Sequence, residues 1–347
     1  MVKRELYLQW DSTEACQLNC IHCYHAHESN ETHLPNDNEM GFLEVITMLD
    51  DLGDTANKWG MIPKLRISGG EPLLRDRLFD ILDYVNEKDI PCGLLTNGLL
   101  ISKKIARDLK KRGVDRIQVS LDGKKERHNI IRRNPLAYDG ALEGIRNAAR
   151  EGIEVTASMT ALKSNYHEFE DVIINSIGAG AKRVGFQSYV PNSKMGIFDP
   201  EYLGPRETLD LFRRTEIFVK KYSSEIHVLR SEVLWQIMQR DNVLKQESRD
   251  AMKYLGGCSA GYFALSVLSD GEVYPCRRLP ISIGNIGEGI VNLITKNKVM
   301  EKLRDLKQMG ENACCENVTH CRGCRAVAYA TTGDYMARDP MCFKDLK

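Results

Sequence analysis

The segment CQLNCIHC, residues 16–23, holds three cysteines and follows shortly after an apolar strand candidate, ELYLQW (5–10). In a chain of 347 residues with 11 cysteines, this spacing arises by chance about 0.01 times. Three thiolates on one short loop can each bind one iron of a four-iron–four-sulfur cluster, which leaves the fourth iron without a protein ligand. An open position on a metal generally binds a substrate or cofactor. The alternative is a zinc site completed by His22 or His25.

Beyond this loop, short β-branched runs alternate with helical patterns as far as about residue 190. The strand candidates are 5–10, 64–68, 91–96, 116–121, 154–160 and 183–190. In KKIARDLKKRG, one of the stretches between them, the apolar residues fall on one helical face. Six β–α units predict an α/β fold with a parallel sheet, open or curled into a partial barrel, and with ligands at the C-terminal ends of its strands.

The composition changes along the chain. Residues 205–250 are charged with a helical pattern, and from about 255 the chain is rich in Cys, Gly and turn residues. We therefore expect a barrel over residues 1–200, a helical connecting segment over 201–254 and a small cysteine-rich domain over 255–347.

Charge and hydropathy exclude several classes of partner. Lys+Arg and Asp+Glu both number 48, so neither nucleic acid nor an anionic membrane is expected. No apolar run approaches the ~18 residues that span a bilayer, and the N-terminus lacks the apolar segment of a signal peptide. The cysteines cluster near the two ends, which is typical of metal ligands in a cytoplasmic protein. Cys92 stands apart and is expected in the core.

The cysteine spacing after the first strand of a β/α barrel resembles the signature of the radical S-adenosylmethionine (SAM) superfamily, with His22 at the usually aromatic position. The resemblance implies a partial (β/α)6 TIM-like barrel. It also implies a four-iron–four-sulfur cluster on Cys16, Cys20 and Cys23, whose open iron binds the amino and carboxylate groups of SAM. An electron from that cluster would cleave SAM to methionine and a 5′-deoxyadenosyl radical, which abstracts hydrogen from the substrate.

Further motifs at strand ends agree with this resemblance. SGGEP (68–72) resembles the family's GGEP element, in which two glycines let backbone carbonyls approach the SAM ammonium and Glu71 can pair with it. SLDG (120–123) resembles the ribose-binding element, and Arg132 matches the arginine that holds the SAM carboxylate. The expected SAM-binding residues are His22, Ser68, Gly69, Gly70, Glu71, Ser120, Arg132, Ser158 and Val190.

Two other polar segments are interpreted differently. Thr96-Asn97-Gly98 closes the third strand, either as a plain turn or as part of the SAM site. His128 is expected on the surface.

The C-terminal cysteines resemble a second known arrangement. Two strand-like runs flank Ser269-Asp270-Gly271 and predict a hairpin that brings Cys258 and Cys276 together. This arrangement is similar to the SPASM domain, which holds two auxiliary four-iron–four-sulfur clusters. The resemblance assigns the inner cluster to Cys258, Cys276 and Cys324. It assigns the outer cluster to Cys315, Cys321 and Cys342.

The ligand sets depart from the SPASM pattern in two places. The usual cysteine three residues before Cys315 is Asn312, and Cys314 lies beside Cys315 instead. Either Cys314 completes the outer cluster or that cluster has a non-cysteine ligand. The inner cluster has three clear cysteines and either an open iron or a further ligand. With the SAM cluster, three clusters are expected in all; a pair of zinc sites is the alternative to the auxiliary two.

The substrate is less well specified by the sequence. SPASM-bearing enzymes act mostly on ribosomally made peptides, by cross-linking, epimerisation or related maturation, and this is the first hypothesis. Sulfatase-maturing relatives carry Asp after the cysteine equivalent to Cys276, where this chain has Arg277-Arg278, which argues against that reaction. Cys16 leaves no room for an N-terminal recognition domain, so a peptide would require a separate recognition protein or the 205–250 segment.

Two alternatives remain. A related set of enzymes removes carboxylates from haem precursors, and a basic pocket around Arg277 and Arg278 would favour such a small-molecule tetrapyrrole decarboxylase. Either enzyme needs an electron donor such as flavodoxin or ferredoxin. A non-enzymatic iron–sulfur or zinc regulator would cleave no SAM.

Overall fold

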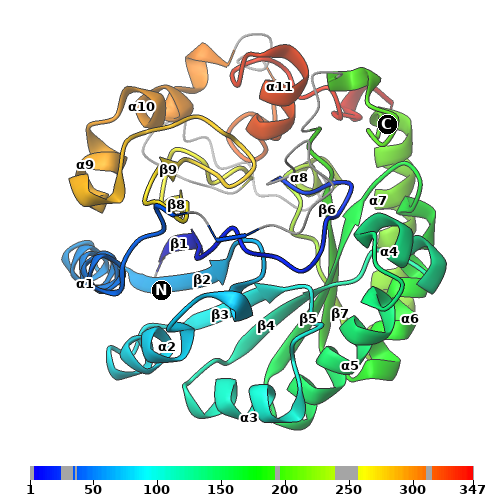
Figure 1. Cartoon of the computed structure of the whole chain (residues 1–347). Coiled ribbons are helices and arrows are strands. Elements are labelled where there is room, and N and C mark those ends of the chain that lie inside the picture. The colour runs from blue at the N-terminus through cyan, green and yellow to red at the C-terminus, as the bar shows by residue number, and fades with distance from the viewer. Residues whose placement is uncertain are drawn as a thin grey trace.

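A nine-stranded sheet organises the structure. The computed structural model describes residues 4–24, 34–35, 37–191, 196–238, 257–309 and 315–346. The strands follow the order β7-β6-β5-β4-β3-β2-β1-β8-β9. Every neighbouring pair is parallel except the last, β8 and β9, which is antiparallel. The sheet curls, and helices cover its outer face (Figure 1).

The six predicted strands of the partial barrel are confirmed. The strands are β1 Glu5–Asp11, β2 Ile62–Ser68, β3 Cys92–Thr96, β4 Arg116–Ser120, β5 Glu154–Ala161, β6 Arg183–Ser188, β7 His227–Val228, β8 Ala264–Val267 and β9 Val273–Tyr274. The sixth predicted strand ends at Ser188, two residues earlier than expected.

Helices follow the strands as parallel pairing requires. They are α1 Phe42–Lys58, α2 Leu78–Glu87, α3 Lys103–Lys111, α4 Lys125–Arg132, α5 Ala137–Arg150, α6 Phe169–Ala179, α7 Pro205–Lys221, α8 Trp235–Met238, α9 Ile290–Thr295, α10 Lys298–Arg304 and α11 Arg325–Thr332. The charged segment predicted to be helical contains α7 and α8, and its remainder from 239 lies outside the described residues. None of the described helices is long and apolar enough to cross a membrane.

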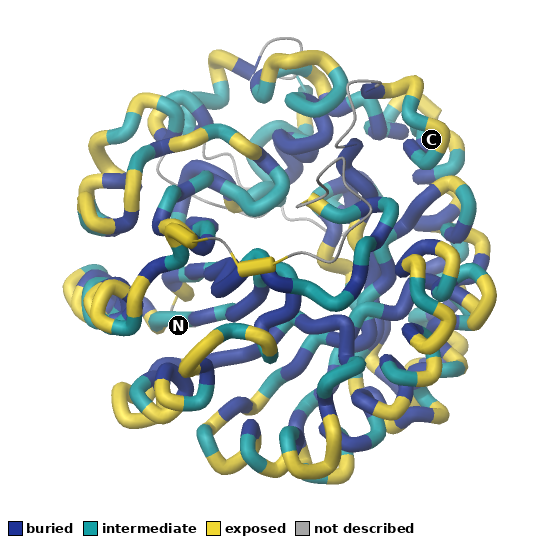
Figure 2. The backbone as a smooth tube through the Cα atoms, viewed as in Figure 1, coloured by how far each residue is buried: buried dark blue, intermediate teal, exposed yellow. Residues whose placement is uncertain are grey.

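The barrel strands separate apolar from polar residues by alternation. On β1, Leu6, Leu8 and Trp10 are buried in the core beneath the helices. Tyr7 and Gln9 point the other way and line a cavity, because successive strand side chains face opposite sides of the sheet. Figure 2 shows the buried strands surrounded by helices whose outer faces are exposed. The barrel therefore has its apolar core outside the sheet and a polar interior.

The cysteine-rich C-terminal part continues the barrel sheet. β8 pairs with β1 in parallel, with Tyr7 opposite Ala264. The predicted hairpin is confirmed: β8 and β9 are antiparallel, and Gly271 in their turn has a positive φ of 87°. At the other end, Phe343 packs on Phe212 of α7, with ring centroids 5.3 Å apart. The predicted boundary near 255 lies between β7 and β8, among residues outside the described ranges.

Two helical glycines give opposite expectations for alanine. A Cβ on Gly144 in α5 would lie 2.3 Å from the Gly98 carbonyl oxygen, whereas a Cβ on Gly53 in α1 would meet nothing within 4 Å. Gly144→Ala should lower the free energy of unfolding by about 1–3 kcal/mol through overpacking, and Gly53→Ala should raise it by about 0.5–1 kcal/mol. Anaerobic thermal unfolding measures both. Equal shifts of the midpoint would contradict the close approach of α5 to the turn after β3.

Candidate active site

A cavity of about 320 Å³ opens at the carboxyl ends of the barrel strands. The cysteine loop, the turn after β2, the ends of β3 to β6 and the loop after β9 line it. Its charged lining residues are Arg132, Arg277 and Arg278, and no Asp or Glu of the described residues lines it. Seven of the nine expected SAM-binding residues line it: His22, Ser68, Gly69, Gly70, Ser120, Arg132 and Ser158.

The three cysteines of the first loop lie together at this cavity. Burial raises the pKa of the Cys16 thiol to about 12, and Cys20 and Cys23 are close enough to raise it further. The loop is tightened by a bond from the Cys23 amide to the Cys20 carbonyl, 3.2 Å long. Burial disfavours the ionised form of these thiols, so they lose their protons only beside a positive charge. A bound metal provides that charge. The loop therefore fits the iron–sulfur cluster expected there.

The two glycines of the GGEP turn are required by the cysteine loop itself. Gly69 has a φ of 132°, and a Cβ there would lie 2.4 Å from the Thr13 carbonyl oxygen. A Cβ on Gly70 would lie 2.3 Å from the Ala15 carbonyl oxygen. The Gly70 amide donates to Thr13 across 2.7 Å. These contacts hold the expected SAM-binding turn directly against the backbone that leads into the cysteines.

Glu71 lies behind the cavity wall. Its carboxylate accepts the Thr96 hydroxyl at 2.8 and 2.9 Å and the backbone amides of Asn97 and Leu73 at 3.0 and 3.2 Å. Burial raises the pKa of Glu71 to about 7. The side chain thus braces the turn after β2 against the end of β3, and its pairing with the SAM ammonium stays a prediction. The Thr96-Asn97-Gly98 segment is more than a plain turn, because Thr96 and Asn97 also line the cavity.

The SLDG motif contributes a buried carboxylate as well as Ser120. Asp122 is fully buried, and one of its oxygens accepts from Nε of Arg132 at 2.6 Å. His22 Nε2 lies 3.4 Å from the same oxygen. Burial alone would raise the pKa of Asp122, but Arg132 together with His22 and His128 outweighs burial and holds that pKa well below its usual range. The sequence analysis named only Ser120 of this motif as a ligand, and Asp122, which is buried behind the cavity wall, was not singled out.

Two expectations about single residues differ from the structure. His128 was expected on the surface but is buried, because it lies one turn before Arg132 on the inner face of α4. Its Nδ1 accepts the Asp122 amide at 2.9 Å, and burial lowers its pKa to about 4. Val190 is buried in the core and does not line the cavity. Cys92, expected in the core, is there.

The C-terminal cysteines influence one another's pKa within each of the two expected groups, and their assignment to two clusters stays a prediction. Burial raises the pKa of Cys276, Arg278 lowers it, and Cys258 raises it again. Burial likewise raises the pKa of Cys324 to about 12, with a smaller contribution from Cys258. The outer group is linked in the same way, since both Cys342 and Cys315 contribute to the raised pKa of Cys321. Cys314 and Asn312 lie outside the described residues.

A mononuclear zinc ion finds no site in the part of the chain that the structure describes. No three His, Cys, Asp or Glu side chains there are close enough to hold one metal ion. Zinc–sulfur bonds of about 2.3 Å draw thiolates close together, whereas a four-iron cluster keeps its ligands farther apart. His25, offered as a zinc ligand, lies outside the described residues.

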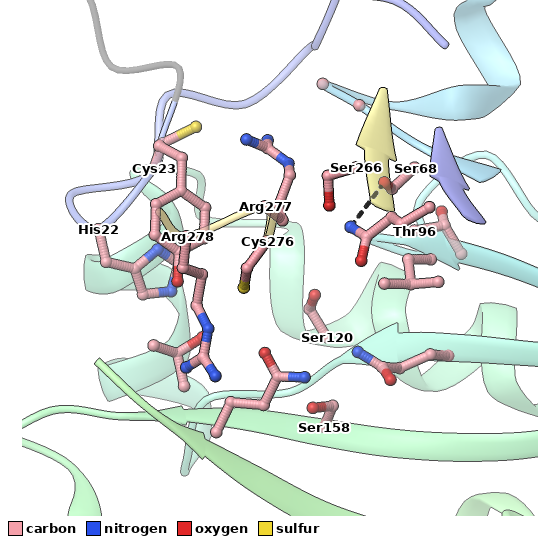
Figure 3. A pocket seen from close by; sticks show the side chains of 18 of the residues that line it. His22, Cys23, Ser68, Thr96, Ser120, Ser158, Ser266, Cys276, Arg277 and Arg278 are labelled. Atoms are coloured by element: carbon pink, nitrogen blue, oxygen red, sulfur yellow. Dashed lines mark hydrogen bonds between the residues drawn. The ribbon is translucent and has the colours of Figure 1, made fainter. Parts of the chain in front are cut away.

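The adjacent arginines after β9 are half-buried and line the cavity wall. Arg277 forms an ion pair with Asp11 at the end of β1 and lies over the Tyr24 ring, 5.3 Å from its centroid. Arg278 donates to the Ser188 carbonyl at the end of β6 across 2.9 Å. Their side chains are only 14% and 17% exposed, so solvent does not surround the pair. Figure 3 shows them leaving one loop in opposite directions, with Cys276 between them.

Comparison with known proteins agrees with this site. A sequence model of the radical SAM superfamily matches residues 10–174, and one of an iron–sulfur cluster-binding domain, SPASM, matches 258–325. The AdoMet-dependent heme synthase of Methanosarcina barkeri is 31% identical over 350 residues, covering 96% of this chain and 95% of that protein. The chain belongs to the radical SAM superfamily. It is an enzyme that uses SAM, and its two domain types indicate iron–sulfur clusters.

Other relatives of this radical SAM enzyme differ in their named activities. The Fe-coproporphyrin III synthase of Methanosarcina barkeri is 27% identical, covering 96% of this chain and 86% of that protein. Among solved structures, anSMEcpe with bound AdoMet and Cp18Cys peptide has a TM-score of 0.73 at 21% identity, covering 99% of this chain and 95% of that one. At that identity the likeness shows the shared fold alone.

The cavity also contains residues that the sequence analysis missed. They are Tyr7, Gln9, Tyr24, Gln118, Thr160, Gln187 and Ser266 among others. Several occupy alternate positions on barrel strands, so the period-2 pattern could have identified them once the apolar positions were assigned to the outer face.

Cys20→Ala should abolish SAM cleavage in the radical SAM enzyme and lower bound iron by about four per chain, because the other groups keep their cysteines. Cys92→Ala is the matched control: it also removes a buried thiol, but one that lies in the core. It should leave iron content and 5′-deoxyadenosine formation unchanged. Anaerobic iron analysis and chromatography of the nucleoside measure both. Nucleoside formation by the Cys20 variant would refute the assignment of the first cluster.

Proposed function

We propose that this radical SAM enzyme abstracts hydrogen from a carboxylate-bearing small molecule of the tetrapyrrole class and decarboxylates its side chain. The observation that carries the proposal is the cavity wall, which Arg277 and Arg278 reach from the loop beside Cys276. Arginine forks bind carboxylates through paired, charge-assisted hydrogen bonds. The relatives named as heme and Fe-coproporphyrin III synthases support the same substrate class.

The proposed reaction balances as an oxidative decarboxylation. The SAM-derived radical takes one hydrogen atom from the carbon β to the carboxylate of a propionate side chain, giving 5′-deoxyadenosine and a carbon radical. Loss of CO2 with transfer of one electron then leaves a vinyl group. The electron needs a one-electron acceptor, and an auxiliary cluster held by Cys258, Cys276 and Cys324 would provide it.

The protein's own residues would bind the substrate and exclude water. Arg277 and Arg278 diverge from one loop, so they can hold carboxylates on two sides of the opening beside Cys276. Tyr24, under the Arg277 guanidinium, offers an aromatic face to a flat macrocycle. Gln9, Gln118 and Gln187 line the interior as neutral donors and acceptors. Such fixed contacts keep a reactive radical in register with one carbon.

Three clusters are part of this proposal. Cys16, Cys20 and Cys23 would hold the SAM cluster, which supplies the electron for SAM cleavage, and the two C-terminal groups would hold the auxiliary pair. An external donor such as flavodoxin or ferredoxin would reduce the SAM cluster, while the inner auxiliary cluster would start oxidised and accept the electron from the substrate radical. A ribosomally made peptide, the first hypothesis from the sequence, has the fold-level likeness to anSMEcpe in its favour and no residue-level observation.

Anaerobic turnover tests the function. Reconstituted enzyme, dithionite, SAM and iron coproporphyrin III should yield 5′-deoxyadenosine together with a porphyrin that has lost CO2 and two hydrogen atoms per side chain. Mass spectrometry of the porphyrin and chromatography of the nucleoside measure the two products. The methyl ester of the same porphyrin is the control, since it keeps the macrocycle but lacks the negative charges. An unaltered porphyrin would overturn the proposal, and then a peptide would be the substrate class to test.

Arg277→Gln should raise KM for the carboxylate substrate about 10- to 100-fold, because a charge-assisted hydrogen bond contributes about 1.5–3 kcal/mol. Arg278→Gln should also raise KM, and in addition lower thermal stability, because Arg278 bonds the end of β6. Steady-state kinetics and thermal unfolding of both variants measure these effects. An unchanged KM in both would show that neither arginine binds the substrate.

A further inference from the structure

Arg132 connects the SLDG motif to the first cysteine loop. Its Nε and one terminal nitrogen each lie 2.6 Å from the same oxygen of Asp122. Its other terminal nitrogen donates to Sγ of Cys20 across 3.6 Å. Each nitrogen of this guanidinium therefore already contacts a partner, one of which is a cysteine that would bind the SAM cluster.

The surrounding backbone fixes this geometry. Arg132 is the last residue of α4, and the Ile21 amide of the cysteine loop donates to the neighbouring Ile131 carbonyl across 3.0 Å. Ile21 and Ile131 also belong to one small apolar cluster. On the other side, the second oxygen of Asp122 accepts the Thr160 amide at 2.9 Å. The arginine is thus held between a fixed carboxylate and a fixed thiol.

We propose that Arg132, oriented by Asp122, sets the reduction potential of the cluster on Cys16, Cys20 and Cys23. A positive charge that donates to a cluster thiolate stabilises the reduced, more negative form, and hydrogen bonds to sulfur are a main determinant of cluster potential. Asp122 opposes this effect because its negative charge partly neutralises the guanidinium. Arg132 is then a positioning and tuning residue in addition to a candidate for the SAM carboxylate.

This inference goes beyond the proposed function and holds for any substrate. It makes opposite predictions for two neighbouring residues. Removing the positive charge in Arg132→Gln should make the cluster harder to reduce, whereas Asp122→Asn should make it easier to reduce. A purely structural role would move both variants the same way, since either change breaks the same ion pair.

The experiment is EPR-monitored redox titration of the full-length reconstituted protein without SAM. We expect about a tenfold fall in the reduction equilibrium constant for Arg132→Gln and about a tenfold rise for Asp122→Asn, which is about 59 mV each way for a one-electron couple. Arg132→Lys keeps the charge and should lie between the wild type and Arg132→Gln. Arg127→Gln is the matched control: it lies on the same helix and pairs with Glu168 at 3.9 Å instead, so it should leave the potential unchanged.

The remaining outcomes overturn the proposal. Shifts of the same sign in the Arg132→Gln and Asp122→Asn variants would overturn the proposal. Unchanged potentials combined with weaker SAM binding would also overturn it, because Arg132 would then be a SAM contact alone. Iron and sulfide analysis shows whether each variant holds its cluster. If Arg132→Gln holds none, the Asp122→Asn titration decides: a rise supports the proposal, and an unchanged or lowered potential refutes it.

Discussion

The parallel pairing of β1 on both of its edges is the constraint on which the site depends. β1 pairs with β2 from Glu5 to Asp11 on one side and with β8 on the other. The chain that leaves β1 is therefore delivered between the GGEP turn, which follows β2, and the hairpin that carries Cys276. The cysteine loop lies next to both the GGEP turn and the hairpin, because parallel strands bring their carboxyl ends to one edge of the sheet. Without β8 against β1, Cys258 and Cys276 would have no fixed relation to the first cysteine loop.

The second constraint is the reversal of polarity inside the barrel. A closed TIM barrel fills its interior with branched apolar side chains, whereas this sheet directs Leu6, Leu8 and Trp10 outward beneath the helices. The interior receives Tyr7 and Gln9 from the same strand. Because the stabilising apolar contacts lie outside the sheet, the interior can remain a polar cavity without loss of the core. Across the interior, Arg278 from the loop after β9 donates to the Ser188 carbonyl at the end of β6.

Local sequence patterns predicted the features of the fold and the site that depend on residues close together in the sequence. The strands, the β8–β9 turn, the cysteine groups and most of the cavity wall follow from period-2 alternation, turn chemistry and spacing. What could not be predicted depends on the direction of a side chain once elements pack. Glu71 turns behind the wall because backbone amides and Thr96 satisfy it there, and His128 turns inward because Asp122 offers its amide. Val190, like Val184 and Phe186 of the same segment, is buried in the core and does not line the cavity. The β1–β8 pairing joins segments more than 250 residues apart, which no local pattern reports.

The cavity arginines share one electrostatic arrangement. Arg132 is paired with Asp122 and Arg277 with Asp11, and both aspartates are fully buried. Arg278 has Glu232 at 4.0 Å. A buried guanidinium with no counter-charge would carry a large desolvation penalty, so each carboxylate stabilises its arginine before any ligand arrives. The three arginines line the cavity, whereas their carboxylate partners lie behind its wall. An anion that enters the cavity therefore meets N–H groups of fixed direction and no carboxylate of the described residues. Under the proposed function, selectivity for carboxylates would rest on the fixed direction of these forks more than on net charge, since the whole chain has equal numbers of acidic and basic residues.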